Sequence, residues 1–190
     1  MSFKDVIDIH RQALDGLPQI QDEVTAAGER IKEQVAKGGK VLWMGNGGSA
    51  ADAQHYAAEL MVRYAVNRPP IPSIALTTDT SLLTAHSNDF EYETVFERQV
   101  EALAQPNDVV VGISTSGNSK NVLLALRKAK EKGALAVAML GNDGGVIAKE
   151  ADIAVVVPFR VTAHIQEMHL MIGHYWCDVL EQAAYKGELF

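Results

Sequence analysis

Residues 41–60 read VLWMGNGGSAADAQHYAAEL, which is a short apolar run, a glycine-rich turn and a longer amphipathic stretch. The apolar run has almost no polar alternation, as is typical of a strand buried on both faces of a parallel sheet. Glycine and asparagine mark a turn, and the residues from Ser49 onward favour a helix. This strand–turn–helix unit indicates an α/β fold.

The same unit recurs along the chain. Four further apolar runs of strand length predict strands at residues 73–76, 109–113, 135–140 and 153–157. Helices are predicted between and after the strands, at residues 49–64, 90–104, 119–132, 144–150 and 163–186. Strands that alternate with helices predict a three-layer αβα sandwich around a five-stranded parallel sheet.

The residues before the first strand are also expected to be helical. Apolar positions at spacings near 3.6 predict helices over 2–15 and 19–37, and Gly38 and Gly39 end the second. A chain of 190 residues suffices for one domain with a substantial core. We therefore predict a single domain over 1–190, with a helical segment at 1–37 and the αβα core at 38–190.

The composition excludes several classes of protein. The formal charge of −7 disfavours nucleic acid and anionic membrane surfaces as partners, because such a chain is not attracted to phosphate backbones. A single cysteine, Cys177, allows no internal disulfide and fits a reducing compartment. Neither a signal peptide nor an apolar run long enough for a membrane helix is visible. We expect a cytoplasmic protein.

Two loops that follow predicted strands are rich in glycine and small hydroxyls. Ligands of open α/β sheets bind at the carboxyl ends of the strands, and helix N-termini there offer free N–H groups and a positive dipole end. These loops predict a phosphate cradle without lysine or arginine, or else simple turns with N-caps. Neither loop has the Walker or the dinucleotide-binding pattern. The candidate residues are Asn46, Gly47, Gly48, Ser49, Ser114, Thr115, Ser116 and Ser119.

Asn88 and Asp89 follow the second predicted strand at a greater distance along the chain. Their amide and carboxylate groups could bind sugar hydroxyls. Segments rich in asparagine and aspartate are also common as plain turns. Both interpretations stay open for these two residues.

Two sets of side chains could carry chemistry. His55 and Glu59 are four residues apart and share a helix face. Gln166 and His174 lie on the last predicted helix, roughly 12 Å apart along its axis, which makes a common target difficult to reach. A carboxylate and an imidazole across a sugar phosphate suit aldose–ketose isomerisation, and the same donors suit Zn²⁺.

Each of these residues also has an ordinary structural interpretation. His55 and Glu59 could form a surface ion pair, and His174 could be a hydrogen-bonded core residue. The remaining histidines and Cys177 are assigned no function, and Cys177 is interpreted as a small buried apolar residue. The residues left without a role are His10, His86 and His169. Sequence chemistry alone therefore predicts a phosphosugar-binding protein.

The chain resembles the sedoheptulose-7-phosphate isomerases of the SIS (sugar isomerase) class. The motifs that carry the resemblance are GNGGSAADAQHYAAEL (45–60), IALTTD (74–79), SNDFEYETVFERQVEAL (87–103), GISTSGNSKNV (112–122) and IQEMH (165–169). They run in register over nearly the whole chain. ISTSGNS alone marks only the broader class, whereas the combination is specific.

The resemblance implies a flavodoxin-like SIS fold and the isomerisation of D-sedoheptulose 7-phosphate to D-glycero-D-manno-heptose 7-phosphate, for lipopolysaccharide or related glycans. It implies a homotetramer with sites at subunit interfaces. It places the catalytic base at Glu59 and the acid at His174. The implied Zn²⁺ ligands, one ion per subunit, are His55, Glu59, Gln166 and His174. The implied substrate contacts are the two loops, Glu59, Asn88, Asp89 and Gln166.

One departure and three alternatives accompany the resemblance. Ala163 and His164 stand where many members carry an arginine, some with an acidic residue before it. The chain could be an adaptor of the type that associates with the replication initiator, but that type lacks a carboxylate at the position of Glu59. It could be a regulator that binds a sugar phosphate without turnover, or an isomerase of another phosphosugar. Retention of Glu59 favours an enzyme.

Overall fold

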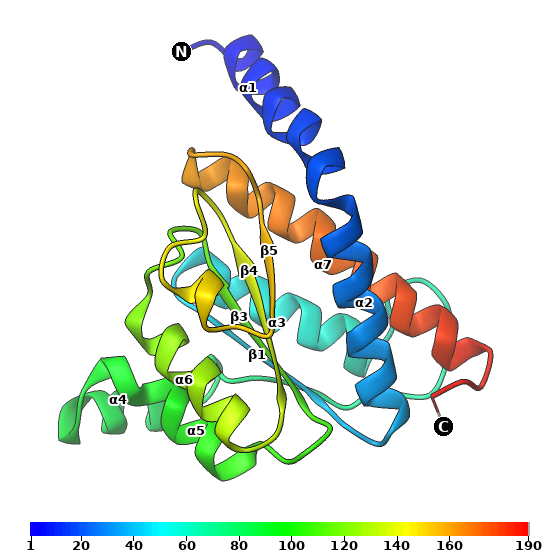
Figure 1. Cartoon of the computed structure of the whole chain (residues 1–190), viewed down its shortest axis with the longest axis vertical. Coiled ribbons are helices and arrows are strands. Elements are labelled where there is room, and N and C mark those ends of the chain that lie inside the picture. Colours follow the sequence, from blue (N-terminus) through cyan, green and yellow to red (C-terminus); the bar gives the residue numbers. More distant parts are fainter. Residues whose placement is uncertain (190) are drawn as a thin grey trace.

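The computed structural model describes residues 1–189 and shows an α/β fold (Figure 1). A five-stranded parallel sheet forms its centre, as predicted. The strands are β1 (Val41–Gly45), β2 (Ser73–Ala75), β3 (Val109–Ser114), β4 (Leu135–Leu140) and β5 (Ile153–Val156). The α-helices are α1 (Phe3–Gly16), α2 (Gln21–Ala36), α3 (Gly48–Met61), α4 (Thr80–Asp89), α5 (Val95–Leu103), α6 (Lys120–Glu131) and α7 (Thr162–Tyr185). Short 3-10 turns are η1 (Leu17–Ile20), η2 (Tyr92–Thr94) and η3 (Ile147–Lys149).

The strand order is β2-β1-β3-β4-β5, and every neighbouring pair is parallel. The chain therefore moves outward from β1 to β2 and then returns to place β3 on the other side of β1. This reversal is the switch point at which open α/β sheets bind ligands. The loops after β1 and β3 flank it.

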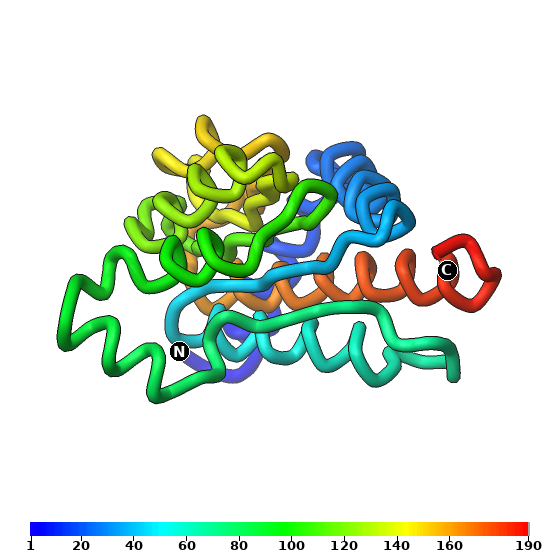
Figure 2. Tube along the Cα trace, turned by 90° about the horizontal axis from the view of Figure 1, so that it is seen from below, coloured from blue at the N-terminus to red at the C-terminus, as the bar shows by residue number. Residues whose placement is uncertain are grey.

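Helices cover both faces of the sheet because successive strand residues point to opposite faces. Val41 and Trp43 pack into one core with α2, α3 and α7, whereas Leu42 and Met44 pack into the other with α5 and α6. Figure 2 shows α3 and α7 running side by side along the first face. The near-continuous apolar character of β1 and β3 follows from this burial on both sides.

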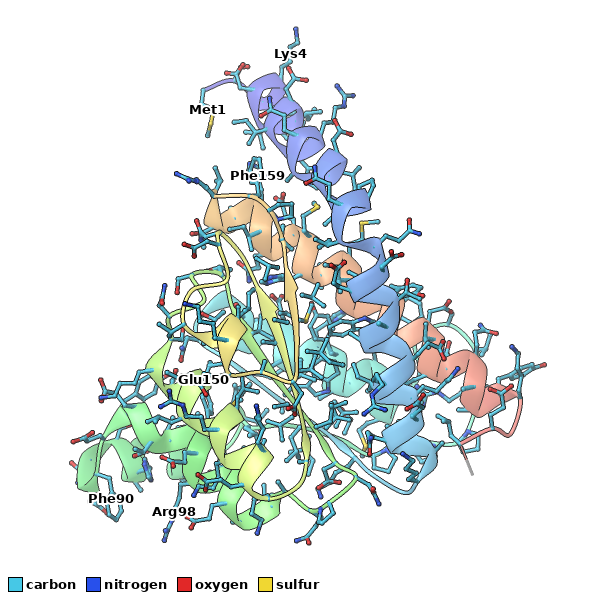
Figure 3. All side chains as sticks on the ribbon, viewed as in Figure 1. Met1, Lys4, Phe90, Arg98, Glu150 and Phe159 are labelled. Carbon is cyan, nitrogen blue, oxygen red and sulfur yellow. The ribbon has the colours of Figure 1, made fainter. Side chains whose placement is uncertain are left out.

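The N-terminal segment consists of α1, η1 and α2, close to the predicted ranges. A capping box begins α1, since Ser2 accepts a hydrogen bond from the backbone of Asp5 and the Asp5 side chain accepts one from Ser2. The far end of α1 projects beyond the sheet, with Met1 and Lys4 at its tip (Figures 1 and 3). Only Ala13 of this helix is buried.

One predicted helix was wrong, and one helix was not predicted. The helix expected at 144–150 is only the 3-10 turn η3, because Gly144 and Gly145 both adopt positive φ and interrupt any helix there. The segment before residue 90 is the helix α4, which begins at the N-cap Asp79. It buries no side chain, so its sequence carries little apolar periodicity. Among residues 1–189, no helix has the length and apolarity needed to cross a membrane.

Candidate active site

The loop after β1 brings the backbone close to α7. Gly47 has φ of 56° and ψ of −119°, a conformation that favours glycine. Gly48 begins α3, and a Cβ atom there would lie 2.1 Å from the side-chain nitrogen of Gln166. No side chain caps this helix, which leaves its N-terminus available to an anion. The first predicted cradle thus meets Gln166 directly.

The loop after β3 gathers hydroxyl groups at the start of α6. The Ser114 Oγ lies 2.9 Å from the Ser119 Oγ and 3.4 Å from the Ser116 Oγ. Ser119 is the N-cap of α6, but its side chain makes no capping hydrogen bond. Gly117 has φ of 68° and packs on the backbone of Gly144. The neutral donors predicted for phosphate therefore lie together.

An asparagine pair joins the two loops. The Asn46 Nδ2 donates to the Asn121 Oδ1 at 2.9 Å, and the Asn121 Nδ2 donates to the Asn46 Oδ1 at 2.8 Å. The hydroxyl of Tyr92 donates to the same Asn46 oxygen at 2.9 Å. Asn121 and Tyr92 were not among the predicted site residues. Both lie within the motifs named above, but their partners are distant in sequence, so this pairing could not be predicted from the sequence.

A second set of side chains meets between α3 and α7. We call His55, Glu59 and His174 the α3–α7 group. The Nε2 atoms of His55 and His174 face each other at 2.8 Å, and the His55 Nε2 lies 3.5 Å from the Glu59 Oε1. The ring centroid of Tyr64 lies 5.4 Å from that of His174. The i, i+4 pair predicted on α3 thus faces the predicted acid.

The surroundings of the α3–α7 group act on the protonation of His174. Burial lowers the pKa of His174, the neighbouring His55 lowers it further, and Glu59 partly offsets both. The side chain of Glu59 is 21% exposed. A carboxylate and two imidazoles thus face one another at a position that solvent can still reach.

Asp52 is a site residue that sequence reasoning missed. It is buried one turn before His55 on α3, and its Oδ2 has no hydrogen-bond partner among the described residues. Burial raises the pKa of Asp52, while the Gln166 side chain and His55 oppose the rise. Asp52, His55 and Glu59 lie at i, i+3 and i+7 of one helix, and this spacing could have revealed their common face.

Gln166 and His174 contact different parts of α3, the first turn and the middle of the helix. Gln166 lies against Gly48, whereas His174 lies against His55. This separation agrees with the distance expected for two residues eight apart on one helix. Of the four implied zinc ligands, His55 thus lies near both Glu59 and His174, whereas Gln166 approaches α3 near Gly48 and Asp52.

A buried ion pair fixes the end of α3 against α7. The Arg68 Nε lies 3.3 Å from the Glu181 Oε2, and both side chains are 0% exposed. Arg68 also donates to the carbonyl oxygens of Glu59 and Leu60. Glu181 accepts backbone hydrogen bonds from Tyr64, Ala65 and Val66. This anchor holds the backbone that carries Glu59.

The other predicted residues have different surroundings. Asn88 and Asp89 lie at the exposed end of α4 and hydrogen-bond to each other at 2.8 Å, and within the described chain neither bonds to the two loops. His169 is buried, and its Nε2 lies 2.9 Å from the carbonyl oxygen of Leu140. Burial lowers the pKa of His169 to about 4, which agrees with the absence of an assigned role. His86 bonds to Thr94.

His10 and His164 depart from expectation. His10 was assigned no role, and His164 was noted only as a departure from the resemblance. Both imidazoles bond to Glu167 at the start of α7, at 2.7 Å and 2.6 Å. We call His10, His164 and Glu167 the α1–α7 group.

Comparison with known proteins agrees with this geometry. Residues 7–141 match the SIS domain family. The match spans most of the sheet and both glycine- and hydroxyl-rich loops. The chain therefore belongs to the SIS domain family.

Individual relatives identify a narrower group of proteins within the SIS family. The chain is 56% identical over 152 residues to the phosphoheptose isomerase of Paramagnetospirillum magneticum, covering 80% of this chain and 79% of that protein. It is 49% identical to the phosphoheptose isomerase of Geotalea daltonii, over 95% and 94% of the two chains. The structure of phosphoheptose isomerase GmhA from Neisseria gonorrhoeae has a TM-score of 0.85 and 39% identity, over 95% of this chain and 100% of that one. Within the SIS family, the chain belongs with the phosphoheptose isomerases, as its motifs predicted.

Proposed function

We propose that the chain is an aldose–ketose isomerase that converts D-sedoheptulose 7-phosphate to D-glycero-D-manno-heptose 7-phosphate through an enediol. The observation that carries the proposal is the arrangement along α3. Its uncapped N-terminus lies at the phosphate loop, and its later turns carry His55 and Glu59 opposite His174. His55 follows Gly48 by about 10 Å along the axis. A phosphate bound at Gly48 would leave the sugar lying along α3.

Each side chain has a role in this proposal. The Glu59 carboxylate removes the proton next to the carbonyl, and His174 moves protons between the hydroxyl and carbonyl oxygens. The loop hydroxyls and the N-termini of α3 and α6 bind the phosphate without a cationic side chain. Gln166 bonds to a sugar oxygen beside Gly48. Asn88 and Asp89, which are exposed on α4, bind hydroxyls of the sugar that occupies the site of a neighbouring subunit.

We propose Zn²⁺ as the metal of this site. The nitrogen atoms of His55 and His174 and the Glu59 carboxylate form a donor set that suits this ion. Because Gln166 of the same chain lies at Gly48, the fourth ligand would be the Gln166 side chain of a neighbouring subunit. When bound, the ion supplies a Lewis acid next to the sugar carbonyl. The short distances from the His55 Nε2 to the His174 Nε2, 2.8 Å, and to the Glu59 Oε1, 3.5 Å, support this assignment.

We also propose a homotetramer in the cytoplasm that supplies heptose for lipopolysaccharide or related glycans. Exposed apolar side chains support the assembly. Met1, before α1, and Phe90, directly after α4, are largely exposed (Figure 3), and so is Phe3 at the start of α1. A groove of about 670 Å³ between the N-terminal helices and α7 is lined by Leu14, Leu17 and Met171, among others. Burying such apolar surface is the usual driving force of association.

The test is an NMR assay with D-sedoheptulose 7-phosphate on the full chain, with added Zn²⁺ and again after chelation. We expect the aldoheptose 7-phosphate to form, and chelation to abolish its formation. A folded protein that yields no product in either condition would refute the isomerase for this substrate. Product that persists after chelation would refute the metal requirement. Light scattering on the same sample measures the subunit number.

A further inference from the structure

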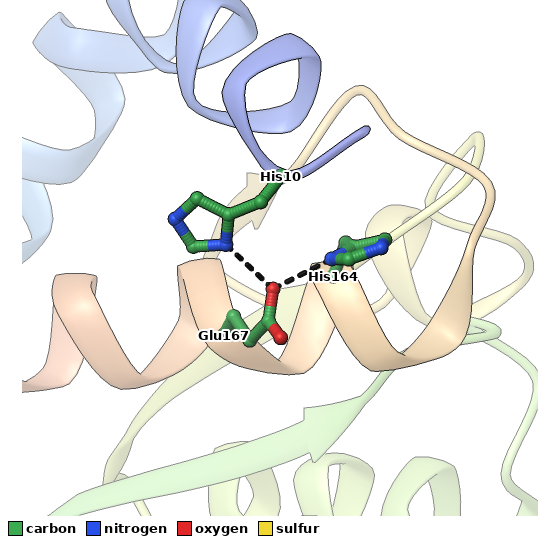
Figure 4. A group of neighbouring side chains, drawn as sticks. All are labelled: His10, His164 and Glu167. Atoms are coloured by element: carbon green, nitrogen blue, oxygen red, sulfur yellow. Dashed lines mark hydrogen bonds and ion pairs between the residues drawn. The ribbon is translucent and has the colours of Figure 1, made fainter. Parts of the chain in front are cut away.

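Three donors from distant parts of the chain meet at the start of α7. His10 extends from α1, and His164 and Glu167 extend from the first turns of α7, all toward one another (Figure 4). The Nδ1 of each imidazole lies within hydrogen-bond distance of a single oxygen, the Glu167 Oε2, at 2.7 Å for His10 and 2.6 Å for His164. All three potential ligand atoms lie within 4.8 Å of one another.

The surroundings of the α1–α7 group hold the His164 side chain in place and leave the side chains of His10 and Glu167 open to solvent. The His164 side chain is 8% exposed, and the rings of His10 and Phe159 pack edge-on against it, each at 6.1 Å. The imidazole of His164 is therefore held in one orientation. The side chains of His10 and Glu167 are each 43% exposed, which leaves room for a water molecule as a further ligand.

The donor chemistry matches a transition metal. Two imidazole nitrogens and one carboxylate oxygen, with an open position, are a common ligand set of Zn²⁺. Ligands at the zinc–nitrogen distance of about 2.0 Å in a tetrahedron lie about 3.3 Å apart. The observed contacts need to widen only slightly to reach that spacing, and two of the three side chains are free to move. An arginine at position 164, as the resemblance implies, would offer no ligand.

We propose that His10, His164 and Glu167 form a binding site for a divalent transition-metal ion, with Zn²⁺ the best fit, that joins α1 to the start of α7. This site is separate from the α3–α7 group. Gln166 lies between His164 and Glu167 in sequence but packs on Gly48, which is the other side of the helix. His174 follows Glu167 by about 10 Å along the axis. An ion at the α1–α7 group stabilises the projecting helix α1 on the body of the protein.

The test measures zinc stoichiometry on the full-length chain. The protein is stripped with a chelator and titrated with Zn²⁺ alone, and bound metal is counted by elemental mass spectrometry. We expect His10→Ala to lose one equivalent per chain relative to the unchanged protein. His86→Ala, which removes an imidazole elsewhere, is expected to lose none. Zinc is also expected to raise the melting temperature of the unchanged protein more than that of His10→Ala.

A second variant distinguishes the loss of a metal ligand from a folding defect. Glu167→Gln keeps the size of the side chain and removes its charge, and we expect it to weaken binding of the same equivalent by more than about tenfold. The double variant His55→Ala/His174→Ala separates this site from the proposed catalytic one, because it is expected to retain the α1–α7 equivalent. If His10→Ala and Glu167→Gln both fold and bind as much zinc as the unchanged protein, the proposal is wrong. Loss of the equivalent only in the double variant would also overturn it.

Discussion

The α3–α7 group and the α1–α7 group contain the same kinds of side chain, two imidazoles and one carboxylate, and share one helix. They differ in what holds them. The α3–α7 group lies on a helix that begins at the switch point of the sheet and is anchored at its other end by Arg68 and Glu181. The α1–α7 group joins α7 to a helix that projects from the sheet and buries only Ala13.

Donor identity alone therefore does not define an active site. The α3–α7 group follows a phosphate loop on the same helix, so a substrate bound there has a direction. The α1–α7 group lies at the same turn of α7 as Gln166, which packs on Gly48, but its own donors join α1 to α7 and fix the relative position of these two helices.

The largest effect is expected at Glu59. Glu59→Gln keeps the shape of the side chain and removes the proposed base, so turnover should fall by about 10²- to 10⁴-fold. Glu101→Gln on α5, where the exposed carboxylate pairs with Arg98, is the matched control and should keep its activity. Steady-state kinetics with circular dichroism on both variants makes the measurement. Near-normal turnover in Glu59→Gln would contradict the assignment of the catalytic base to the α3–α7 group.

The next largest effect is expected in the stability of the fold, at the buried ion pair of Arg68 and Glu181. Glu181→Gln leaves Arg68 buried without its counter-charge and should destabilise the fold by about 3–5 kcal/mol. Burial alone would raise the pKa of Glu181, but backbone N–H groups and Arg68 outweigh it, and the pKa is lowered. The stabilisation is therefore complete above the ordinary glutamate pKa of about 4.3 and is lost as pH falls below it.

Urea unfolding of both proteins across the acidic range tests this. The gap between the unchanged protein and Glu181→Gln should be constant near neutral pH and should narrow below about pH 4. A gap that widens on acidification, or none at neutral pH, would show that the anchor does not hold α3.

A smaller effect is expected at Gly48. In Gly48→Ala the new methyl group would overlap the Gln166 side chain and push it away from the phosphate loop. Turnover should fall by about tenfold or more, since small displacements of positioning groups are costly. The melting temperature should change little, because the end of a glutamine side chain can move. Ala51→Ser on the exposed face of the same turn is the control, and equal kinetics in both variants would show that Gln166 has no such role.

The centre of the sheet was predictable from sequence because β1, β3 and β4 are buried on both faces and therefore consist almost entirely of apolar residues. The helix α4 was not, since a helix that buries no side chain leaves no periodic pattern. His55 and Glu59 were found by their spacing on one helix. Asp52 was overlooked, because a carboxylate on a helix usually faces solvent. The α1–α7 group could not be read from sequence, since His10 and Glu167 are 157 residues apart.

The buried thiol of Cys177 has a practical consequence. It is the only cysteine, it is 1% exposed, and burial raises its pKa to about 12, so little reactive thiolate forms near neutral pH. The unmodified chain is therefore expected to react little with thiol-labelling reagents. A single cysteine introduced at exposed Phe3 would accept a fluorophore or spin label selectively, and the motion of α1 could be followed without first removing a native residue.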